Sequence, residues 1–365
     1  MFDRRLVVNF DWILLLTVCS LAGIGILNLY SATANWQFAS TPIYMKQLIW
    51  LGGGLALVLL ICCFDYRHLE HFSILAYIIT IGMLSSVLLL GKTSMGATRW
   101  LNLGFFNLQP SEVIKIVMIL LLARTFGRTA LPEGYSMADL WRPALLLLLP
   151  VGLILKQPDL GTALMLIFIS MSMLLFAGVQ NKTLLGLFIL GGVAVVLGWF
   201  GLHDYQRERI QTFLNPEADP LGSGYHIIQS KIAVGSGGFF GKGFLQGTQS
   251  QLSFLPERHT DFAFSVFAEE WGFVGCSLLL LGYLFLVVWG IYIARHAADR
   301  FGMFLAIGVT AMIFWHIVVN LGMVNGLLPV VGVPLPLFSY GGTSMVTTMV
   351  GIGLLMNVSM RRFMF

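Results

Sequence analysis

Long apolar runs are the feature that most narrows what this sequence can fold into. Crossing about 30 Å of hydrocarbon takes roughly 20 helical residues, and such stretches recur along the whole chain. Charged residues make up only 10% of the sequence, whereas soluble domains carry about 25%, so a water-facing surface cannot be built around these runs. The sequence predicts an all-α polytopic membrane protein with about ten transmembrane helices, near residues 12–30, 47–64, 72–91, 110–124, 141–155, 159–179, 183–202, 271–293, 302–322 and 343–360.

Lysine and arginine residues indicate the orientation, because they collect in short loops on the cytoplasmic side. With a cytoplasmic N-terminus, the inside segments hold Arg4, Arg5, Arg67, Arg124, Arg128, Arg142, Lys182, Arg295, Arg300, Arg361 and Arg362. The short outside segments hold only Lys46, Lys92, Arg99 and Lys156. We therefore expect both termini in the cytoplasm and the long segment 203–270, between the seventh and eighth helices, outside. The positive charges form no stripe, which argues against nucleic acid as a partner.

The positions of the cysteines do not indicate disulfide bonds. The four cysteines all lie inside apolar runs, at Cys19, Cys62, Cys63 and Cys276. None has a partner in a polar loop, so the sequence predicts neither a disulfide nor a metal-binding spacing. We treat residues 1–365 as a single transmembrane domain.

The external segment 203–270 is long, and long connections in compact proteins are usually functional. It contains a glycine-rich stretch with interleaved aromatic residues, 235–243. This stretch could approach a ligand closely or serve as a flexible connection. Residues 225–234 have the apolar spacing of a helix that lies along the membrane surface.

The fourth and fifth helices are expected to be short at their outer ends. The apolar run 141–155 spans only about 22 Å at 1.5 Å per residue and contains Pro150. The uninterrupted part of the fourth run begins only after Lys115. Short or interrupted helices often mark binding sites in membrane proteins. We therefore predict a water-filled pocket sunk into the outer leaflet.

Ionisable residues gather at this predicted pocket. Glu112 and Lys115 are three residues apart and so share one face of the fourth helix, while Lys156 and Asp159 flank the next outer turn. Charges at membrane depth are costly and are usually paired or line a wet cavity. Glu112 and Lys115 could simply neutralise each other inside the bundle. That interpretation weakens when Arg99, Lys156 and Asp159 are expected at the same depth.

Several helices begin at the outer face with features that favour anions. Gln109-Pro110 and Gln157-Pro158 place proline in the first helical turn, where its missing N–H costs nothing. The stretch 338–344, which ends at Ser344, opens the tenth helix in a similar way. Free backbone N–H groups and the positive end of the helix dipole attract negative charge there. A ligand that carries pyrophosphate would suit this arrangement.

The external segment ends in a carboxylate between aromatic residues. Thr260 is a candidate N-cap, which would place Asp261 in the first helical turn beside Phe262 and Phe264. A carboxylate against apolar walls can act as a general base because its pKa is raised. An aspartate at this position also complements the helix dipole, and the spacing alone favours that simpler role.

Longer motifs resemble those of a known family. They are 109–112 (Gln-Pro-Ser-Glu), 157–162 (Gln-Pro-Asp-Leu-Gly-Thr), 207–216 (Arg-Glu-Arg-Ile-Gln-Thr-Phe-Leu-Asn-Pro), 219–222 (Asp-Pro-Leu-Gly), 224–226 (Gly-Tyr-His), 247–250 (Gly-Thr-Gln-Ser), 255–262 (Leu-Pro-Glu-Arg-His-Thr-Asp-Phe) and 341–344 (Gly-Gly-Thr-Ser). In order and along essentially the whole chain, they resemble the SEDS family (shape, elongation, division and sporulation). The Gly-Tyr-His and Gly-Thr-Gln-Ser spellings resemble its elongation branch.

The resemblance implies a peptidoglycan glycosyltransferase in the bacterial plasma (inner) membrane that polymerises lipid II on the outer face during cell elongation. It implies Asp261 as the catalytic residue and Glu112, Lys115 and Asp159 as the polar cavity. Inverting transfer needs one base on the acceptor hydroxyl and positive charge at the departing pyrophosphate. Candidates for binding substrate are Arg99, Lys115, Lys156, Arg207, Arg209, Lys242, Gln109, Gln157 and Ser344. A divalent cation, Mg²⁺ or Mn²⁺, could assist, but no ligand motif establishes one.

The expected partners also follow from the resemblance. They are a class B penicillin-binding protein that crosslinks the strands, lipid II and undecaprenyl-pyrophosphate-linked glycan, and other membrane proteins of the elongation complex. A lipid II flippase or other transporter is the competing class, since buried charges and short helices suit it. A flippase should offer charges along a path to both faces, whereas here they lie on the outer side. A non-catalytic scaffold is the third class, and it would need neither Asp261 nor the buried pair.

Overall fold

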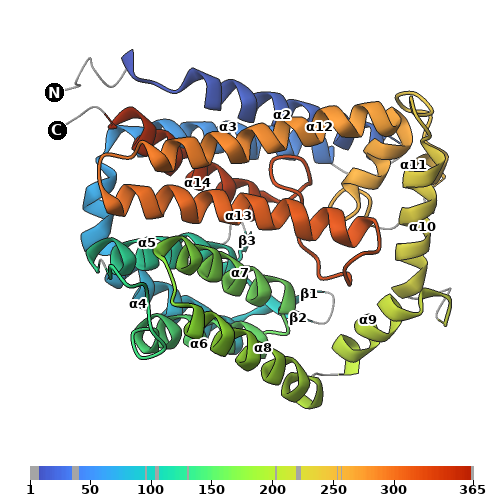
Figure 1. The fold of residues 1–365 in the computed structure, drawn as a ribbon. Helices are drawn as coiled ribbons and strands as arrows, with labels where there is room; N and C mark the ends of the chain where they lie inside the picture. Colours follow the sequence, from blue (N-terminus) through green and yellow to red (C-terminus); the bar gives the residue numbers. More distant parts are fainter. Residues whose placement is uncertain are drawn as a thin grey trace.

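The computed structural model describes residues 8–34, 41–94, 97–102, 107–129, 131–201, 204–218, 223–252, 254–255 and 257–362. Arg4 and Arg5, the motif at 219–222 and Pro256 lie outside the described residues. The described chain is mostly helical (Figure 1).

Helices stand at all ten positions expected from the apolar runs. They are α2 (Trp12–Ala32), α3 (Ile43–Cys63), α4 (Tyr66–Leu90), α5 (Pro110–Arg128), α6 (Trp141–Lys156), α7 (Leu160–Ala177), α8 (Asn181–Gly201), α12 (Ala263–Arg295), α13 (Arg300–Val324) and α14 (Gly342–Met360). Among the described residues, eight of these helices are long and apolar enough to cross a membrane. The other two are α5 and α6, the helices for which the sequence predicted short apolar spans.

Aspartate side chains begin several of these helices. Asp11 accepts a hydrogen bond from Leu14 N at 3.0 Å at the start of α2. Asp299 accepts one from Gly302 N at 2.7 Å at the start of α13. Each carboxylate satisfies a backbone N–H that has no partner within the helix. Asp11 also accepts a hydrogen bond from Ser359 Oγ at 2.8 Å, so the beginning of α2 and the end of α14 meet at one end of the bundle.

The centre of the bundle is formed by α13 and α14, the two most deeply buried of the apolar helices. Helix α14 packs along α3, and α13 packs along α5, α7 and α12. Gly308 permits the close approach of α13, because a β-carbon there would lie 2.5 Å from Ile119 Cγ2 and 2.9 Å from Met173 Sδ. Packing at this distance holds α5 and α7 at fixed positions against α13.

The described part of segment 203–270 is more structured than the sequence indicated. It contains α9 (Asp204–Leu214), the 3₁₀ helix η1 (Pro216–Ala218), α10 (Ser223–Ser236) and the short α11 (Thr248–Gln251). The helical spacing noticed at 225–234 is confirmed by α10, which crosses the ends of the spanning helices (Figure 1). The glycine-rich stretch lies against a kink of α12 at Gly272, where φ is +61°. Backbone hydrogen bonds from Phe273 N to Gly238 O at 2.9 Å and from Lys242 N to Glu269 O at 3.0 Å join the two.

Three local expectations differ from the structure. Pro158 is not in the first turn of α7, because that helix begins at Leu160 with Asp159 as its N-cap. Thr260 is not the N-cap of α12, because that helix begins at Ala263 after Phe262, and the Thr260 hydroxyl donates to Glu257 instead. Asp261 therefore sits in a turn before the helix. The fold is also not purely helical, since β1 (Lys92–Ser94), β2 (Ala97–Asn102) and β3 (Asn107–Leu108) form a small antiparallel sheet in the order β1-β2-β3 between α4 and α5. Threonines pair across it at Thr93 and Thr98, and β-branched residues suit strands.

Candidate active site

A buried ion pair lies at the start of α5. Lys115 Nζ is 2.7 Å from Glu112 Oε1, and their side chains are only 2% and 8% exposed. The three-residue spacing brings the two side chains together on one face of the helix. The predicted pairing is therefore present in the structure, in a place where neither charge is solvated by bulk water.

His316 completes this cluster from α13. Its Nδ1 lies 2.7 Å from the carbonyl oxygen of Met312, and its Nε2 lies 2.9 Å from Lys115 Nζ. Because a carbonyl oxygen can only accept, Nδ1 carries the proton, and Nε2 accepts a hydrogen bond from the ammonium. The lysine is thus held by a carboxylate on its own helix and by a neutral imidazole on the neighbouring one.

A second polar group forms where α7 begins. Asp159 caps α7 by accepting hydrogen bonds from Thr162 Oγ1 at 2.9 Å and Thr162 N at 3.3 Å. Gln109 Nε2 donates to Asp159 Oδ2 at 3.4 Å, and Arg99 Nη1 lies 3.8 Å from Asp159 Oδ1. Arg99 also donates to the carbonyl oxygen of Pro158. Residues from β2, the start of α5 and the start of α7 therefore meet. The sequence placed Arg99 and Asp159 at one depth, together with Lys156, but it did not predict the contact of Gln109.

Asp261 lies in the turn 257–262 that precedes α12. Asn320 of α13 donates a hydrogen bond to its carbonyl oxygen at 3.0 Å. The neighbouring Gly332 borders the carboxyl, since a β-carbon at Gly332 would lie 3.6 Å from Asp261 Oδ2. His259, in the same turn, accepts a hydrogen bond from Tyr340 N at its carbonyl oxygen, at 2.8 Å. Two distant parts of the chain thus hold this turn in place.

The electrostatic environment of Asp261 suits a proton acceptor. Burial, and to a smaller extent the Glu257 carboxylate, raise the pKa of the Asp261 carboxyl to about 6, while the positive charges of Arg209 and Arg99 act in the opposite direction. Burial lowers the pKa of the His259 imidazole from its ordinary value. A carboxylate with a pKa near the working pH is a better general base than an ordinary one.

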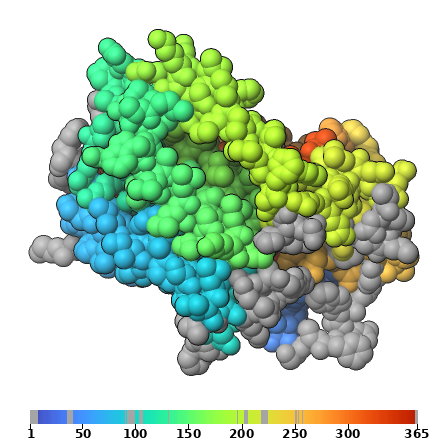
Figure 2. Space-filling model, turned by 90° about the horizontal axis from the view of Figure 1, so that it is seen from below, coloured from blue at the N-terminus to red at the C-terminus, as the bar shows by residue number. Residues whose placement is uncertain are grey.

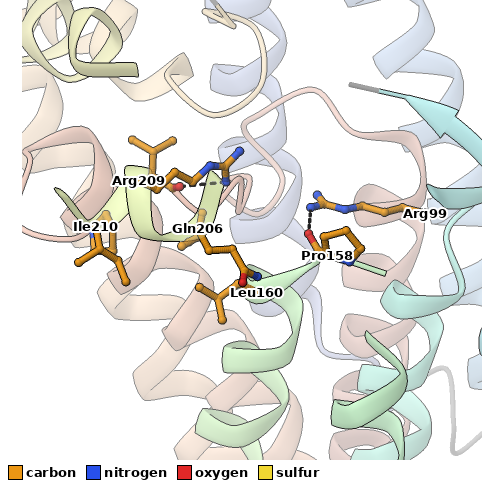
Figure 3. Close-up of a pocket in the computed structure, with 9 residues that line it drawn as sticks. Arg99, Pro158, Leu160, Gln206, Arg209 and Ile210 are labelled. Carbon is orange, nitrogen blue, oxygen red and sulfur yellow. Dashed lines mark hydrogen bonds between the residues drawn. The ribbon is translucent and has the colours of Figure 1, made fainter. Parts of the chain in front are cut away.

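A pocket opens between Arg99 and Arg209 (Figure 3). Arg209 of α9 donates from Nη1 to the carbonyl oxygen of Val330 at 3.1 Å across one wall, while Arg99 and Pro158 form the opposite side. Viewed from below the orientation of Figure 1, the surface is hollowed beside α6, α8 and α9 (Figure 2). The residues that line the pocket are Arg99, Pro158, Leu160, Gln206, Arg209, Ile210, Pro329, Val330 and Val331.

The remaining candidates from the sequence lie elsewhere. Lys242 Nζ pairs with Glu269 at 2.7 Å, which holds the glycine-rich stretch against α12. Arg207 donates to the carbonyl oxygens of Trp199 and Phe200 at the end of α8. Gln157 is buried and donates to Leu84 O at 2.8 Å on α4, and Lys156 is exposed at the end of α6. Ser344 stands in the first turn of α14, outside the residues that line the pocket.

Sequence reasoning missed His316, Asn320 and Gln206. His316 and Asn320 are isolated polar residues within the apolar run of α13, and polar residues at membrane depth are themselves a signal of function. Their i, i+4 spacing places them on one face. Among the described residues, no group of three or more His, Cys, Asp and Glu side chains could hold a metal ion, and we assign no chemical step to a metal ion.

Comparison with known proteins identifies the family. Residues 11–363 match the FtsW/RodA/SpoVE family, described as cell cycle proteins. The chain belongs to this family. Among its relatives, the peptidoglycan glycosyltransferase MrdB of Escherichia coli (strain K12) is 43% identical over 338 residues, which cover 92% of this chain and 91% of the relative. These figures extend the family likeness across nearly the whole protein, as the sequence motifs predicted.

Solved structures of the family share the fold. A chain from a study of the structural coordination of polymerization and crosslinking by a peptidoglycan synthase complex is 36% identical with a TM-score of 0.83, covering 98% of this chain and 99% of that chain. The rod shape determining protein RodA of Thermus thermophilus is 31% identical with a TM-score of 0.72, covering 98% of both chains. Together with the eight apolar helices among the described residues, this likeness makes the chain a multi-pass membrane protein with a RodA-like fold.

Proposed function

We propose that this protein is a peptidoglycan glycosyltransferase that polymerises lipid II on the outer face of the bacterial plasma membrane during cell elongation. Support comes from its relatives, which include an enzyme named for this activity at 43% identity. The observation that carries the proposal for this chain is Asp261. Its carboxyl has a pKa raised to about 6 and stands near two arginines that line a pocket, Arg99 and Arg209.

The proposed reaction is an inverting transfer with Asp261 as the general base. The 4-hydroxyl of the acceptor sugar attacks the anomeric carbon of the donor from the face opposite the pyrophosphate. As the new C–O bond forms, the Asp261 carboxylate takes the hydroxyl proton. The bond to the pyrophosphate breaks, and its electron pair leaves with the undecaprenyl pyrophosphate. One carboxylate is enough, because the leaving group departs as a stable anion and needs no proton, unlike the leaving group of a glycoside hydrolase.

Positive side chains of the site stabilise the departing anion in this mechanism. Arg99 and Arg209 line the pocket from two sides, and guanidinium groups bind phosphate oxygens through paired hydrogen bonds. Lys115 lies deeper, where Glu112 and His316 fix its ammonium. Such preorganised charges stabilise the transition state without reorganising during the reaction.

The setting of the site in the cell belongs to the same proposal. We place both termini in the cytoplasm, ten spans in the membrane and segment 203–270 outside, with residues 1–365 acting as one domain. A relative belongs to a complex described as coordinating polymerization and crosslinking, which supports a class B penicillin-binding protein as the partner. A topology reporter should give an external signal after Gly222 and an internal one at Lys182. Exchanged signals would contradict the orientation and the outer-face site.

Lipid II polymerisation by the purified protein tests the role of Asp261. Asp261→Asn keeps the shape and removes the basicity, so polymerisation should be abolished while membrane level and lipid II binding stay near wild type. General-base catalysis typically contributes about 100- to 10,000-fold. His259→Ala is the matched control in the same turn and should have a milder effect. An Asp261→Asn protein that polymerises at nearly the wild-type rate would refute the assignment, and an inactive His259→Ala beside it would transfer the role to the histidine. A protein that moves lipid II across vesicles without polymerising it would instead be a flippase.

A further inference from the structure

Asn320 of α13 makes hydrogen bonds to two separate segments of the chain. Its side chain is fully buried, and its Nδ2 donates hydrogen bonds to the carbonyl oxygen of Asp261 at 3.0 Å and to that of Val333 at 2.8 Å. Both partners can only accept, so the amide nitrogen must face them and both of its protons are used. The orientation of this side chain is therefore fixed by its partners.

These two hydrogen bonds join the segments that surround the Asp261 carboxyl. One segment is the turn 257–262. The other contains Gly332, which follows the pocket residue Val331 and has φ of +73°. A β-carbon at Gly332 would lie 3.6 Å from Asp261 Oδ2, so the carboxyl rests against this backbone. Loss of the Asn320 amide would remove its hydrogen bond to the wall beside the carboxyl and leave the turn with the hydrogen bond from Tyr340 N to His259 O.

The same face of α13 also holds the buried ammonium. His316 precedes Asn320 by one helical turn, a rise of about 6 Å, and residues four apart lie on one face. His316 accepts a hydrogen bond from Lys115 Nζ at 2.9 Å. The deeply buried helix α13 is therefore in contact with both the turn that carries Asp261 and the cluster of Lys115, Glu112 and His316.

We infer that Asn320 is a positioning residue, which fixes Asp261 at a set distance from the Lys115 cluster by tying the turn 257–262 to α13. The inference rests on the proposed role of Asp261 and extends it to a residue that touches no reacting atom. A misplacement of about 1 Å at a catalytic group can cost 100-fold in rate. Asn320 should therefore affect turnover much more than substrate binding.

Several charged and titratable groups face Asp261 from the surrounding elements. Glu257 is in its own turn, Arg209 is on α9 and Arg99 is on β2. His226 of α10 stacks on the neighbouring Phe262 at a ring distance of 6.2 Å, whereas His316 of α13 contacts Lys115. Burial is the largest cause of the raised pKa of Asp261. A released turn would expose the carboxyl to water and lower its pKa, so the acid limb of the pH–rate profile should move to lower pH.

Asn320→Leu in the full-length purified protein tests this inference, because leucine is of similar size and donates no hydrogen bond. The matched control is Asn357→Leu. Asn357 is also buried, and its Nδ2 also donates to two backbone carbonyls, those of Ile61 at 2.6 Å and Phe64 at 2.7 Å. It lies near the opposite end of α14 from the pocket. Asn320→Leu removes two buried hydrogen bonds. Asn357→Leu removes the matching two and also the one that Asn357 Oδ1 accepts from Arg361, but only Asn320 touches the turn of Asp261.

We expect Asn320→Leu to lower kcat for lipid II polymerisation by about 10- to 100-fold, with KM within about twofold of wild type and the acid limb shifted to lower pH. Asn357→Leu should lower the amount of folded protein, with kcat per folded molecule and the acid limb unchanged. If Asn320→Leu fails to fold, Asn320→Gln keeps the amide, displaces it by one methylene and should show the same kinetic pattern.

The inference is overturned if both variants lose activity only in proportion to folded protein and share the wild-type acid limb. Asp261→Asn separates this result from a failure of the proposed function. If Asp261→Asn is inactive and Asn320→Leu has a normal kcat, only the positioning role of Asn320 is refuted. An active Asp261→Asn removes the proposed base, and with it the basis for assigning a position to Asn320.

Discussion

Lys115→Met is the substitution that best separates a structural from a functional role for the buried pair. Methionine keeps much of the length of the lysine side chain and removes its charge. Glu112, whose side chain is 8% exposed, would then keep a negative charge without the ammonium that lies 2.7 Å away. His316 would also lose the donor to its Nε2. Breaking a buried pair from one side typically costs about 3–5 kcal/mol, a large share of a total stability of about 5–15 kcal/mol.

The double variant Lys115→Met/Glu112→Gln should recover most of that stability. Both charges are then absent, and replacing a buried pair by neutral groups of similar size is often close to neutral. His316 Nε2 still lacks its lysine donor, which leaves a deficit of about 1–3 kcal/mol. Catalysis should not recover, because the double variant has no cation in the site.

Two assays on the same preparations decide between the roles. Thermal unfolding in detergent and membrane level should rank wild type above the double variant and the double variant above Lys115→Met. Lipid II polymerisation per folded molecule should be low in both variants. A Lys115→Met protein as stable as wild type would refute the assigned cost of the stranded charge. A double variant that regains polymerisation together with stability would show that the pair is structural only.

Four further expectations follow from individual contacts. Glu112→Ala should reduce polymerisation and membrane level more than Glu112→Gln, because glutamine keeps the volume and can still hydrogen-bond to Lys115; equal losses in both assays would contradict this. For the wild type, kcat/KM should fall about tenfold per pH unit below about pH 6, because the Asp261 carboxyl has a pKa raised to about 6; a rate independent of pH down to pH 5 would exclude it as the base. The same raised pKa means that the stability from the protonated carboxyl is lost as pH rises from about 4 to 6. In thermal unfolding, Asp261→Asn should therefore be more stable than the wild type by about 1–3 kcal/mol at pH 7 and equally stable below pH 4. Lys242→Met should lower stability by about 1–3 kcal/mol, since Glu269 loses a charged partner. Its kcat per folded molecule should be unchanged, and a large fall in kcat would show that Lys242 acts in the site.

The apolar runs predicted the helices well, because a hydrocarbon solvent imposes one length and one composition on every span. The sequence also predicted the contact of Glu112 with Lys115, since their separation on one helix fixes their distance. The approach of Arg99 to Asp159 followed from expecting these two residues at one depth in the membrane. In each case a rule of local geometry or membrane depth was sufficient.

Other predictions depended on tertiary contacts that no local rule supplies. Lys242 was a candidate for binding anions because it is cationic and sits in a glycine-rich stretch. In the structure a carboxylate 27 residues later, Glu269, pairs with it. This pairing arises because α12 is kinked at Gly272, which lets the backbone of the stretch lie against the helix. Gln157 likewise turned to a carbonyl oxygen of α4. Charge identifies a candidate, but the fold decides which partner neutralises it.

The candidate site is assembled from distant parts of the chain, and two of them contact α13. Lys115 from α5 contacts His316, and the turn of Asp261 contacts Asn320, one turn further along. The close packing of Gly308 against Ile119 of α5 sets the separation of those two helices. A membrane protein cannot use the hydrophobic effect to press its helices together, so close packing and interhelical hydrogen bonds must do so. The contacts that stabilise the bundle at α13 are for that reason the same contacts that set the distance between the proposed base and the buried cation.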